Sequence, residues 1–327
     1  MPSSPTVPSS QEVWTVNRSQ MAVVVPTFRA ASSWNALTAA IAQQNFPANQ
    51  VLIVDSNSED GTSQAAIAAG FAVTSIAQSD FNHGGTRQRA AEQLPWAKIV
   101  IFLTQDAIPL PGAFDALLSV FDDPTVGAAF GRQLPHRGAG PIEAHARNFN
   151  YPAESRVMNF ESRYTLGIKA TFLSNSFAAY RVAALQQVGG FPTNVIMAED
   201  AIVAARLLMN GWKTAYVADA QVFHSHAYTI TQEFRRYFDT GVYHTRESWL
   251  RETFGKPQSE GRRFVLSELS SLLPHHLYLV PPTVLRTVAK YIGYQLGLHE
   301  ATLGKKWSQR LSYHTSYWDS PHNKHQP

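Results

Sequence analysis

Two adjacent carboxylates, Glu199 and Asp200, stand where a helical pattern begins, in the stretch "EDAIVAARLLMNGW". Neighbouring acids can divide the work of a general base, since one can remove a proton while the other orients the reacting group. They can equally cap the helix and interact with the positive end of its dipole. Because the sequence shows no partner for them, their types and spacing alone favour capping, and the base is the alternative.

One aspartate and two histidines form a second set of candidates. Asp106 follows the apolar run "IFLTQ", and a carboxylate at a strand end can bind Mg²⁺ or Mn²⁺ while substrate phosphates complete the coordination. His224 and His226 in "QVFHSH" are two residues apart, so on a strand they would point the same way. Each could be a metal ligand or a hydrogen-bonded structural residue. A zinc site needs three or four ligands, so a metal hydrolase is the weaker interpretation.

A glycine pair occurs in the stretch "FNHGGTRQRA", with His83 before it and Arg87 after it. Gly84 and Gly85 precede a helical pattern, so free backbone N–H groups and the positive end of the helix could bind a diphosphate. The stretch is neither a GxGxxG fingerprint nor a P-loop. Paired glycines alone more often mark a turn.

The elements that must position these residues alternate between strand-like and helix-like patterns. Apolar runs and helical segments follow one another at residues 21–28, 33–44, 50–56, 63–70, 71–77, 84–94 and 98–104. This alternation predicts an α/β fold with a mostly parallel sheet flanked by helices. Ligands bind such sheets beyond the carboxyl ends of the strands, where the acids and the glycine pair recur. The polar residues 132–162 predict a long loop or lid.

Composition and charge limit the classes of protein. The 327 residues are 44% hydrophobic and 16% charged, and they contain no cysteine, which excludes disulfides and thiol catalysis. Residues 231–327 hold 13 Lys/Arg against 8 Asp/Glu, a balance of +5, whereas the first 230 hold 14 against 16, a balance of −2. A basic C-terminal part suggests an anionic surface or substrate near that end. We expect neither a signal peptide nor a membrane-spanning helix.

Seven segments in order resemble glycosyltransferase family 2, the inverting enzymes of the GT-A fold. They are "VVVPTFR", "VLIVDSNSEDGT", "FNHGGTRQRA", "IFLTQDAIP", "LSNSFAAYRVAALQQVGGF", "MAEDAIVAARLLMNGW" and "VFHSH", over residues 21–230. "FNHGGTR" and "TQDA" resemble the bacterial rhamnosyltransferase branch. Thr104 stands where the D-x-D motif of the family usually has its first acid, a departure that bears on metal binding.

The resemblance implies a role for each candidate. The residues that match the nucleotide-sugar pocket are Pro26, Thr27, Arg29, Asp55, Asp60, His83, Gly84, Gly85, Arg87, Gln105 and Asp106. Among these, Asp55 would contact the base or ribose and Asp60 the base edge. Asp106 would also bind a divalent cation together with His224, or with His226 as the alternative. The acids that match the catalytic base are Asp200 and, beside it, Glu199.

The chemistry of inversion agrees with these roles. A single in-line displacement needs a base for the acceptor hydroxyl and stabilisation of the leaving diphosphate by a divalent cation, Mg²⁺ or Mn²⁺. The resemblance implies dTDP-L-rhamnose as the donor and a lipid-linked glycan of cell-surface polysaccharide, such as O-antigen, as the acceptor. A UDP- or GDP-sugar transferase is one alternative, and an inactive nucleotide- or glycan-binding scaffold is another. We expect no nucleic-acid partner.

We divide the chain into three parts. Residues 1–20 are expected to be a flexible tail, residues 21–230 a GT-A domain, and residues 231–327 a helical region. The basic and aromatic side chains of the helical region could rest on the cytoplasmic face of the inner membrane. The alternative is an ordinary helical cap on the catalytic domain. We therefore expect a cytoplasmic protein that can be peripheral to that membrane.

Overall fold

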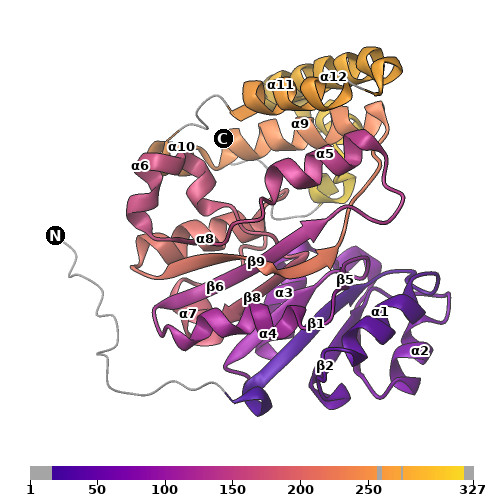
Figure 1. Cartoon of the computed structure of the whole chain (residues 1–327), viewed down its shortest axis with the longest axis vertical. Coiled ribbons are helices and arrows are strands. Elements are labelled where there is room, and N and C mark those ends of the chain that lie inside the picture. The colour runs from indigo at the N-terminus through magenta and orange to yellow at the C-terminus, as the bar shows by residue number, and fades with distance from the viewer. Residues whose placement is uncertain (1–16, 256–259, 274, 320–327) are drawn as a thin grey trace.

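The computed structural model describes residues 17–255, 260–273 and 275–319 (Figure 1). Most of the predicted N-terminal tail, residues 1–16, lies outside the described residues. The rest of it includes a short 3₁₀ helix, Arg18–Gln20, which leads directly into the first strand. Residues 17–20 therefore belong to the folded part of the chain.

The first half of the sheet is parallel, as the alternating pattern predicts. Its four strands lie in the order β3-β2-β1-β4. The elements are β1 Met21–Thr27, α1 Trp34–Ala42, β2 Val51–Asp55, α2 Thr62–Ala68, β3 Ala72–Ser75, α3 His83–Glu92 and β4 Ile99–Leu103. Every residue of β2 and β4 is buried, because helices cover both faces of the sheet.

The second half of the sheet is mixed. Strand β8, Phe177–Arg181, runs antiparallel between β4 and β6, Val126–Leu134. The other elements are β5 Ile108–Pro109, α4 Ala113–Leu118, β7 Arg156–Met158, α6 Arg163–Leu166, α7 Val182–Gln187, α8 Glu199–Met209 and β9 Lys213–Phe223. The α/β class and the flanking helices are confirmed, although antiparallel pairing is as frequent as parallel pairing among the described strands.

The reversed direction of β8 has a consequence for the site. The residues that precede β8 meet the carboxyl end of β4, and the Thr104 N–H donates a hydrogen bond to the Ser176 carbonyl oxygen at 3.1 Å. The loop 174–176 is thereby held next to Asp106. Alternate residues of the strands face two separate hydrophobic cores, one with α1, α2 and α4 and the other with α3, α7 and α8.

The region predicted as a long loop or lid, residues 132–162, is instead largely structured. It contains the end of β6, the helix α5 Pro141–Asn150, and β7. Pro141 occupies the first turn of α5, a position that suits proline. Rings of α5 pack against Phe264, which lies 5.2 Å from His145 and 5.1 Å from Phe149 between ring centroids. The many Arg, His and Pro residues of this region obscured its helical periodicity.

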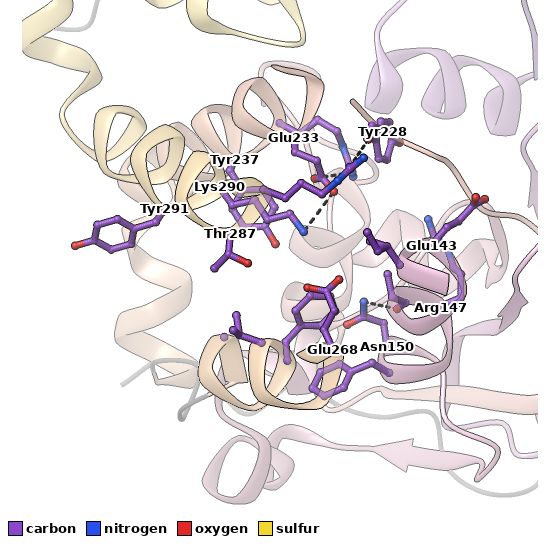
Figure 2. Close-up of a pocket in the computed structure, with 18 of the residues that line it drawn as sticks. Glu143, Arg147, Asn150, Tyr228, Glu233, Tyr237, Glu268, Thr287, Lys290 and Tyr291 are labelled. Carbon is purple, nitrogen blue, oxygen red and sulfur yellow. Dashed lines mark hydrogen bonds and ion pairs between the residues drawn. The ribbon is translucent and has the colours of Figure 1, made fainter. Parts of the chain in front are cut away.

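Helices follow the sheet, as predicted for the C-terminal part: α9 Ile230–Arg246, α10 Ser248–Phe254, α11 Glu260–Leu272, α12 Val280–Leu298 and α13 Glu300–Leu311. Phe238 of α9 and Leu250 of α10 join the core beneath α8. Helix α12 lies directly on α9, since a Cβ on Gly297 would be only 2.1 Å from the Phe238 carbonyl oxygen. Within the described residues no helix has the length and apolarity to cross a bilayer. Helices α5, α9, α11 and α12 enclose a cavity (Figure 2).

Candidate active site

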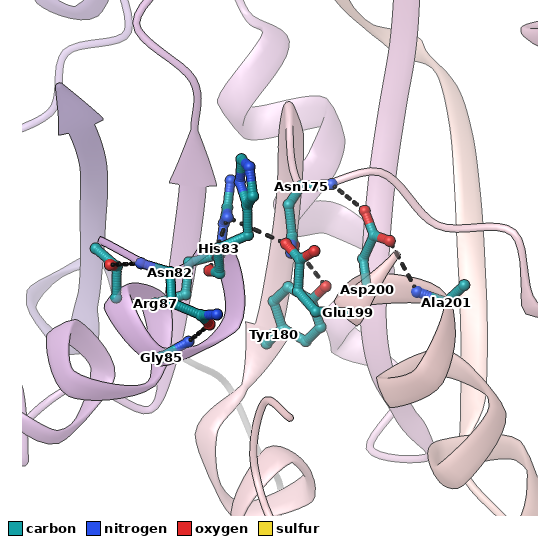
Figure 3. Close-up of polar contacts among 10 residues, drawn as sticks. Asn82, His83, Gly85, Arg87, Asn175, Tyr180, Glu199, Asp200 and Ala201 are labelled. Carbon is teal, nitrogen blue, oxygen red and sulfur yellow. Dashed lines mark hydrogen bonds and ion pairs between the residues drawn. The ribbon is translucent and has the colours of Figure 1, made fainter. Parts of the chain in front are cut away.

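A buried ion pair joins helix α3 to helix α8. Arg87 Nη1 lies 3.0 Å from Glu199 Oε1, and the two side chains are only 5% and 8% exposed (Figure 3). The same guanidinium nitrogen also donates to the His83 carbonyl oxygen at 2.9 Å. Burial raises the pKa of the Glu199 carboxyl, but the positive charge of Arg87, the neighbouring His83 and the hydrogen bond from Asn175 together outweigh burial and lower that pKa. Glu199 is therefore held as an anion.

Asp200, the next residue, is held by backbone donors. Its Oδ2 accepts from the Asn175 N–H at 3.0 Å, and its Oδ1 accepts from the Ala201 N–H at 2.8 Å. Burial and the neighbouring charge of Glu199 raise the pKa of Asp200 to about 7. Ala198, just before the pair, has a left-handed backbone with φ of 61°, a conformation that costs energy in a non-glycine residue. The start of α8 is thus shaped to present a carboxylate that gains and loses a proton near neutral pH.

Asn175 connects both acids and was not among the predicted residues. Its side-chain N–H donates to Glu199 Oε1 at 3.0 Å while its backbone N–H binds Asp200, and the Tyr180 hydroxyl donates to its Oδ1 at 2.6 Å (Figure 3). The only signal for Asn175 in the sequence was its position as a polar residue in "LSNSFAAYR", just before an apolar strand. Asn175 therefore fixes the positions of the Glu199 and Asp200 carboxylates relative to each other.

The glycine pair allows helix α3 to lie against the segment before α8. A Cβ on Gly84 would lie 1.8 Å from the Pro192 carbonyl oxygen, so only glycine fits there without movement. The Gly85 N–H donates to the side chain of Asn82, which caps the helix, at 2.8 Å. Both glycines are buried. Their role in this structure is packing, and direct contact with a diphosphate remains a prediction.

His83 lies at the surface of this cluster. Part of the His83 side chain is exposed to solvent, but protein atoms surround most of the imidazole. The resulting desolvation lowers the pKa of the imidazole. Its ring centroid lies 5.3 Å from that of His314, which belongs to the segment after α13. Asp239 of α9 accepts the backbone N–H groups of Tyr313 and His314, both at 3.0 Å. The C-terminal part of the chain therefore forms one wall beside the acids.

Asp106, His224 and His226 form the candidate metal centre. Their ligand atoms all lie within 4.8 Å of one another, with 3.4 Å between Asp106 Oδ1 and His224 Nε2 and 3.5 Å between Asp106 Oδ2 and His226 Nε2. Strand β9 ends at Phe223, so the histidines follow it rather than lie on it, yet both face the aspartate. Both histidines, and not only one of them, therefore lie close enough to Asp106 to share a cation with it.

Gln133 orients one of these ligands. Its Oε1 accepts from Arg147 Nη1 at 2.7 Å, and arginine can only donate, so the orientation of the amide is fixed. The same oxygen lies 2.9 Å from His224 Nδ1, which must therefore donate as well. In the neutral imidazole the lone pair is then on Nε2, the atom that faces Asp106. Such support is typical of metal-bound histidines.

The donor set fits a divalent cation. Burial lowers the pKa of His226 to about 4, so that ring is neutral at pH 7. The Asp106 carboxylate and the facing lone pair of His224 Nε2 repel each other unless a cation lies between them. Two nitrogen ligands suit Mn²⁺ better than Mg²⁺, which prefers oxygen.

A chain of contacts connects the metal centre to the acid pair. His224 contacts Gln133, whose Nε2 donates to the Ser174 hydroxyl at 2.8 Å. The next residue, Asn175, binds Asp200 through its backbone. The metal ligands and the acids therefore share one region, as the interpretation from the sequence requires.

Asp55 ends strand β2 with no exposed surface. Both of its oxygens accept hydrogen bonds, from the Thr27 hydroxyl at 2.9 Å, the Ser58 N–H and hydroxyl at 2.7 Å, and the Ser63 hydroxyl at 2.9 Å. Burial raises the pKa of Asp55, but these hydrogen bonds outweigh it and lower the pKa. Pro26 lies next to Thr27 at the end of β1. Asp55 organises the loop after β2, and its contact with a base or ribose remains a prediction.

The remaining candidates lie in neighbouring turns. Asp60 accepts from the N–H and hydroxyl of Thr62, at 3.2 and 2.6 Å, and so caps the start of α2. The Gln105 amide exchanges two hydrogen bonds with the backbone of Phe28, at 2.7 and 3.0 Å, and ties the end of β4 to the end of β1. Arg29 is exposed, and its guanidinium lies 5.1 Å from the centroid of the Phe28 ring. Among these three side chains, Arg29 is free to meet an anion.

The metal centre generates the first testable prediction. We expect Asp106→Asn to abolish Mn²⁺ binding and Gln133→Met to weaken it by about 10- to 100-fold, since the second substitution frees His224 to turn. Electron paramagnetic resonance of free Mn²⁺ during a titration measures both affinities. Asp219→Asn, at an exposed position of β9, is the matched control and should bind as the unchanged protein does. If Gln133→Met binds Mn²⁺ as tightly as the unchanged protein, Gln133 does not orient His224 for metal binding.

Comparison with known proteins places this geometry in a family. The sequence pattern described as "Glycosyltransferase like family 2" matches residues 19–241. The chain is 44% identical to the O-antigen chain rhamnosyltransferase WbaN of Salmonella anatum, over 91% of this chain and 95% of that one. It is 42% identical to the O-antigen chain rhamnosyltransferase RfbN of Salmonella typhimurium, over 92% and 96%.

A solved structure with a similar fold is the mannosyltransferase PcManGT from Pyrobaculum calidifontis in complex with GDP-Man and Mn²⁺. Its TM-score is 0.53 at 20% identity, over 91% of this chain and 85% of that one. This likeness shows the GT-A fold. The pattern match and the two relatives confirm the resemblance seen in the sequence: the chain belongs to glycosyltransferase family 2.

Proposed function

We propose that the protein transfers L-rhamnose, with inversion, from dTDP-L-rhamnose to a hydroxyl of a lipid-linked glycan during O-antigen synthesis. The observation that carries this proposal is the placement of Asp200, with its raised pKa, in the same region as the Asp106, His224 and His226 cluster. The names of the two Salmonella relatives support rhamnose as the sugar and the O-antigen chain as the product.

In this mechanism Asp200 is the general base. The acceptor hydroxyl has a high pKa, so its proton must pass to Asp200 as the new glycosidic bond forms and the bond to the diphosphate breaks. Asn175 holds the Asp200 carboxylate in place. Glu199, which Arg87 keeps anionic, raises the proton affinity of the Asp200 carboxylate. A divalent cation, Mg²⁺ or Mn²⁺, would supply charge stabilisation to the leaving diphosphate at Asp106 and the two histidines.

The donor would lie along the carboxyl ends of β1, β2 and β4. We propose that the exposed Arg29 and His83 meet the nucleotide and its diphosphate directly. The other pocket candidates would shape the turns that hold it: Pro26, Thr27, Asp55, Asp60, Gly84, Gly85, Arg87 and Gln105. On this assignment residues 21–230 carry the donor chemistry, and residues 231–327 complete the acceptor side.

An exposed apolar stripe on α12 supports a peripheral position on the cytoplasmic face of the inner membrane. Its members recur at helical spacing and are 46 to 64% exposed: Val284, Leu285, Val288, Tyr291 and Ile292. Leu277 and Tyr278, just before the helix, are 64 and 72% exposed. Helix α11, which contacts α12 at the end of the molecule far from α2 (Figure 1), adds the exposed Arg262 and Arg263. Apolar and aromatic side chains beside cations suit an anionic bilayer surface.

The donor assignment is tested by thermal shift with Mn²⁺ present. We expect dTDP-L-rhamnose to raise the melting temperature more than UDP-glucose or GDP-mannose, because a ligand at about 100 times its Kd adds about 2.7 kcal/mol of stability. The shift should shrink in Asp106→Asn. A larger shift with UDP-glucose or GDP-mannose would contradict dTDP-L-rhamnose as the donor and assign the other nucleotide sugar instead. If none of the three nucleotide sugars shifts the melting temperature, the result would contradict the transferase function itself.

The base assignment predicts a pH dependence. Asp200 must be ionised to accept a proton, so kcat/KM should rise with pH through about 7 and level off above it. Glu199→Gln removes the negative charge that raises the pKa of Asp200, so the midpoint should move to lower pH. Asp200→Asn should reduce the rate by at least about 100-fold. A midpoint that does not move in Glu199→Gln would show that another group controls the rate.

The membrane proposal is tested by sedimentation with vesicles of phosphatidylglycerol and phosphatidylethanolamine. The double change Leu285→Glu and Ile292→Glu should weaken binding by at least about tenfold, since burying one such side chain contributes about 1.5–3 kcal/mol. Ile67→Glu, at a 64% exposed position on α2, is the matched control and should bind unchanged. Sedimentation of the double variant to the same extent as the control would exclude this surface.

A further inference from the structure

The cavity between α5, α9, α11 and α12 has no role in the chemistry described so far (Figure 2). Its volume is about 960 Å³, at the upper end of the range for small-molecule sites. The two cavity walls come from parts of the chain far apart in sequence, since α5 precedes β8 whereas α9, α11 and α12 follow the sheet.

The cavity reaches the active site from two directions. His226, one of the three candidate metal ligands, lines it. So does Thr240 of α9, whose hydroxyl contacts Met197 Sδ at 3.8 Å, three residues before Asp200. A molecule in the cavity would therefore extend toward both the metal centre and the base.

Aromatic rings form much of the cavity wall. They come from α5, the segment before α9, and the C-terminal helices: Phe149, Tyr228, Tyr237, Phe264 and Tyr294. Flat rings that alternate with polar groups offer both apolar contact and hydrogen bonds, which suits a ligand with C–H faces and hydroxyl edges. The Tyr237 side chain points into this space (Figure 2).

Among the described residues, four of the five cations that line the cavity contact a neighbouring side chain or backbone group, and the fifth is the exposed Arg262. Arg236 and Lys290 pair with Glu233, at 3.9 and 3.3 Å. Arg147 donates to Gln133, and Arg286 donates to the Tyr228 carbonyl oxygen. Five cations and four acids line the cavity, the acids being Glu143, Glu233, Glu260 and Glu268. Because the charges nearly balance, the interior favours a neutral polar ligand over a diphosphate or a nucleotide.

Glu268 of α11 is the exception among the acids that line the cavity. It is only 3% exposed and lines the cavity, and no described residue gives its carboxylate a hydrogen bond or ion pair. A buried carboxyl without hydrogen bonds is costly, and burial raises the pKa of Glu268. Its oxygens can accept hydrogen bonds from ligand hydroxyls, which would offset that cost.

We propose that this cavity binds the sugar residues of the acceptor glycan, with Glu268 accepting hydrogen bonds from their hydroxyls and Tyr237 donating one. The cavity would guide the terminal sugar between His226 and Asp200, where its hydroxyl is activated. This assignment rests on the proposed transferase function and names the acceptor as a neutral oligosaccharide. Glu268 and Tyr237 are specificity-determining residues in it, not catalytic ones.

Binding of simple glycosides tests the site without the natural acceptor. Saturation-transfer NMR titrations of the full chain with methyl glycosides of galactose, glucose, mannose and rhamnose should detect at least one binder. Its affinity should fall by about tenfold in Glu268→Gln, since a hydrogen bond to a charged group is lost. Tyr237→Phe, which retains the ring, should show a similar loss and serves as the readout if Glu268→Gln does not fold. Asp219→Asn is the control for the carboxylate-to-amide change.

The dTDP-L-rhamnose thermal shift separates this inference from the proposed function. We expect that shift to persist in Glu268→Gln and Tyr237→Phe, because the donor lies at the other side of the metal centre. Absence of glycoside binding, or binding that is equal in the variants and the control, overturns the acceptor site while the donor shift still supports the transferase. Loss of the donor shift in both variants also overturns it, because the cavity would then serve the donor.

Discussion

The arrangement of the active site depends on the buried ion pair between Arg87 and Glu199. Two desolvated charges are stable only when they compensate each other with good geometry, and here one charge comes from α3 and the other from α8. The glycine at position 84 lets the two helical segments approach closely enough for the pair to form. Because the pair keeps Glu199 negative, it also sets the proton affinity of Asp200. One interaction thus supports both the packing and the acid–base chemistry.

The direction of β8 explains how distant parts of the chain meet at this point. A strictly parallel continuation of the sheet would bring the start of β8 to the opposite edge, away from the end of β4. The antiparallel strand instead places residues 174–176 beside Asp106, and Asn175 then contacts the first turn of α8. This one reversal brings Asp106, which follows the first half of the sheet, close to Asp200 and the two histidines, which belong to the second half.

The sequence predicted the parts of the fold and site that local pattern determines. Apolar strands, the helix after Asp200 and the polar strand ends follow from periodicity and composition. The Arg87–Glu199 pair links residues 112 positions apart, and the Gln133 contact to His224 links residues 91 apart. Such contacts depend on the order and direction of the strands in the sheet. The pattern of residues within one strand indicates neither of these. The helix α5 was missed for another reason, since the many Arg, His and Pro residues around it obscured its helical periodicity.

The departure at Thr104 has a physical explanation in the metal centre. A D-x-D motif brings two carboxylates from one strand end, whereas this chain has only Asp106 there. His224 and His226 lie at similar distances from Asp106, so the second imidazole would supply the third ligand of the cation site that we propose. Exchange of a carboxylate for a neutral imidazole removes one negative charge near the leaving diphosphate. A cation held by Asp106 and two imidazoles would retain more of its positive charge for the diphosphate, which would favour departure of that group at the cost of weaker metal binding in the absence of the donor.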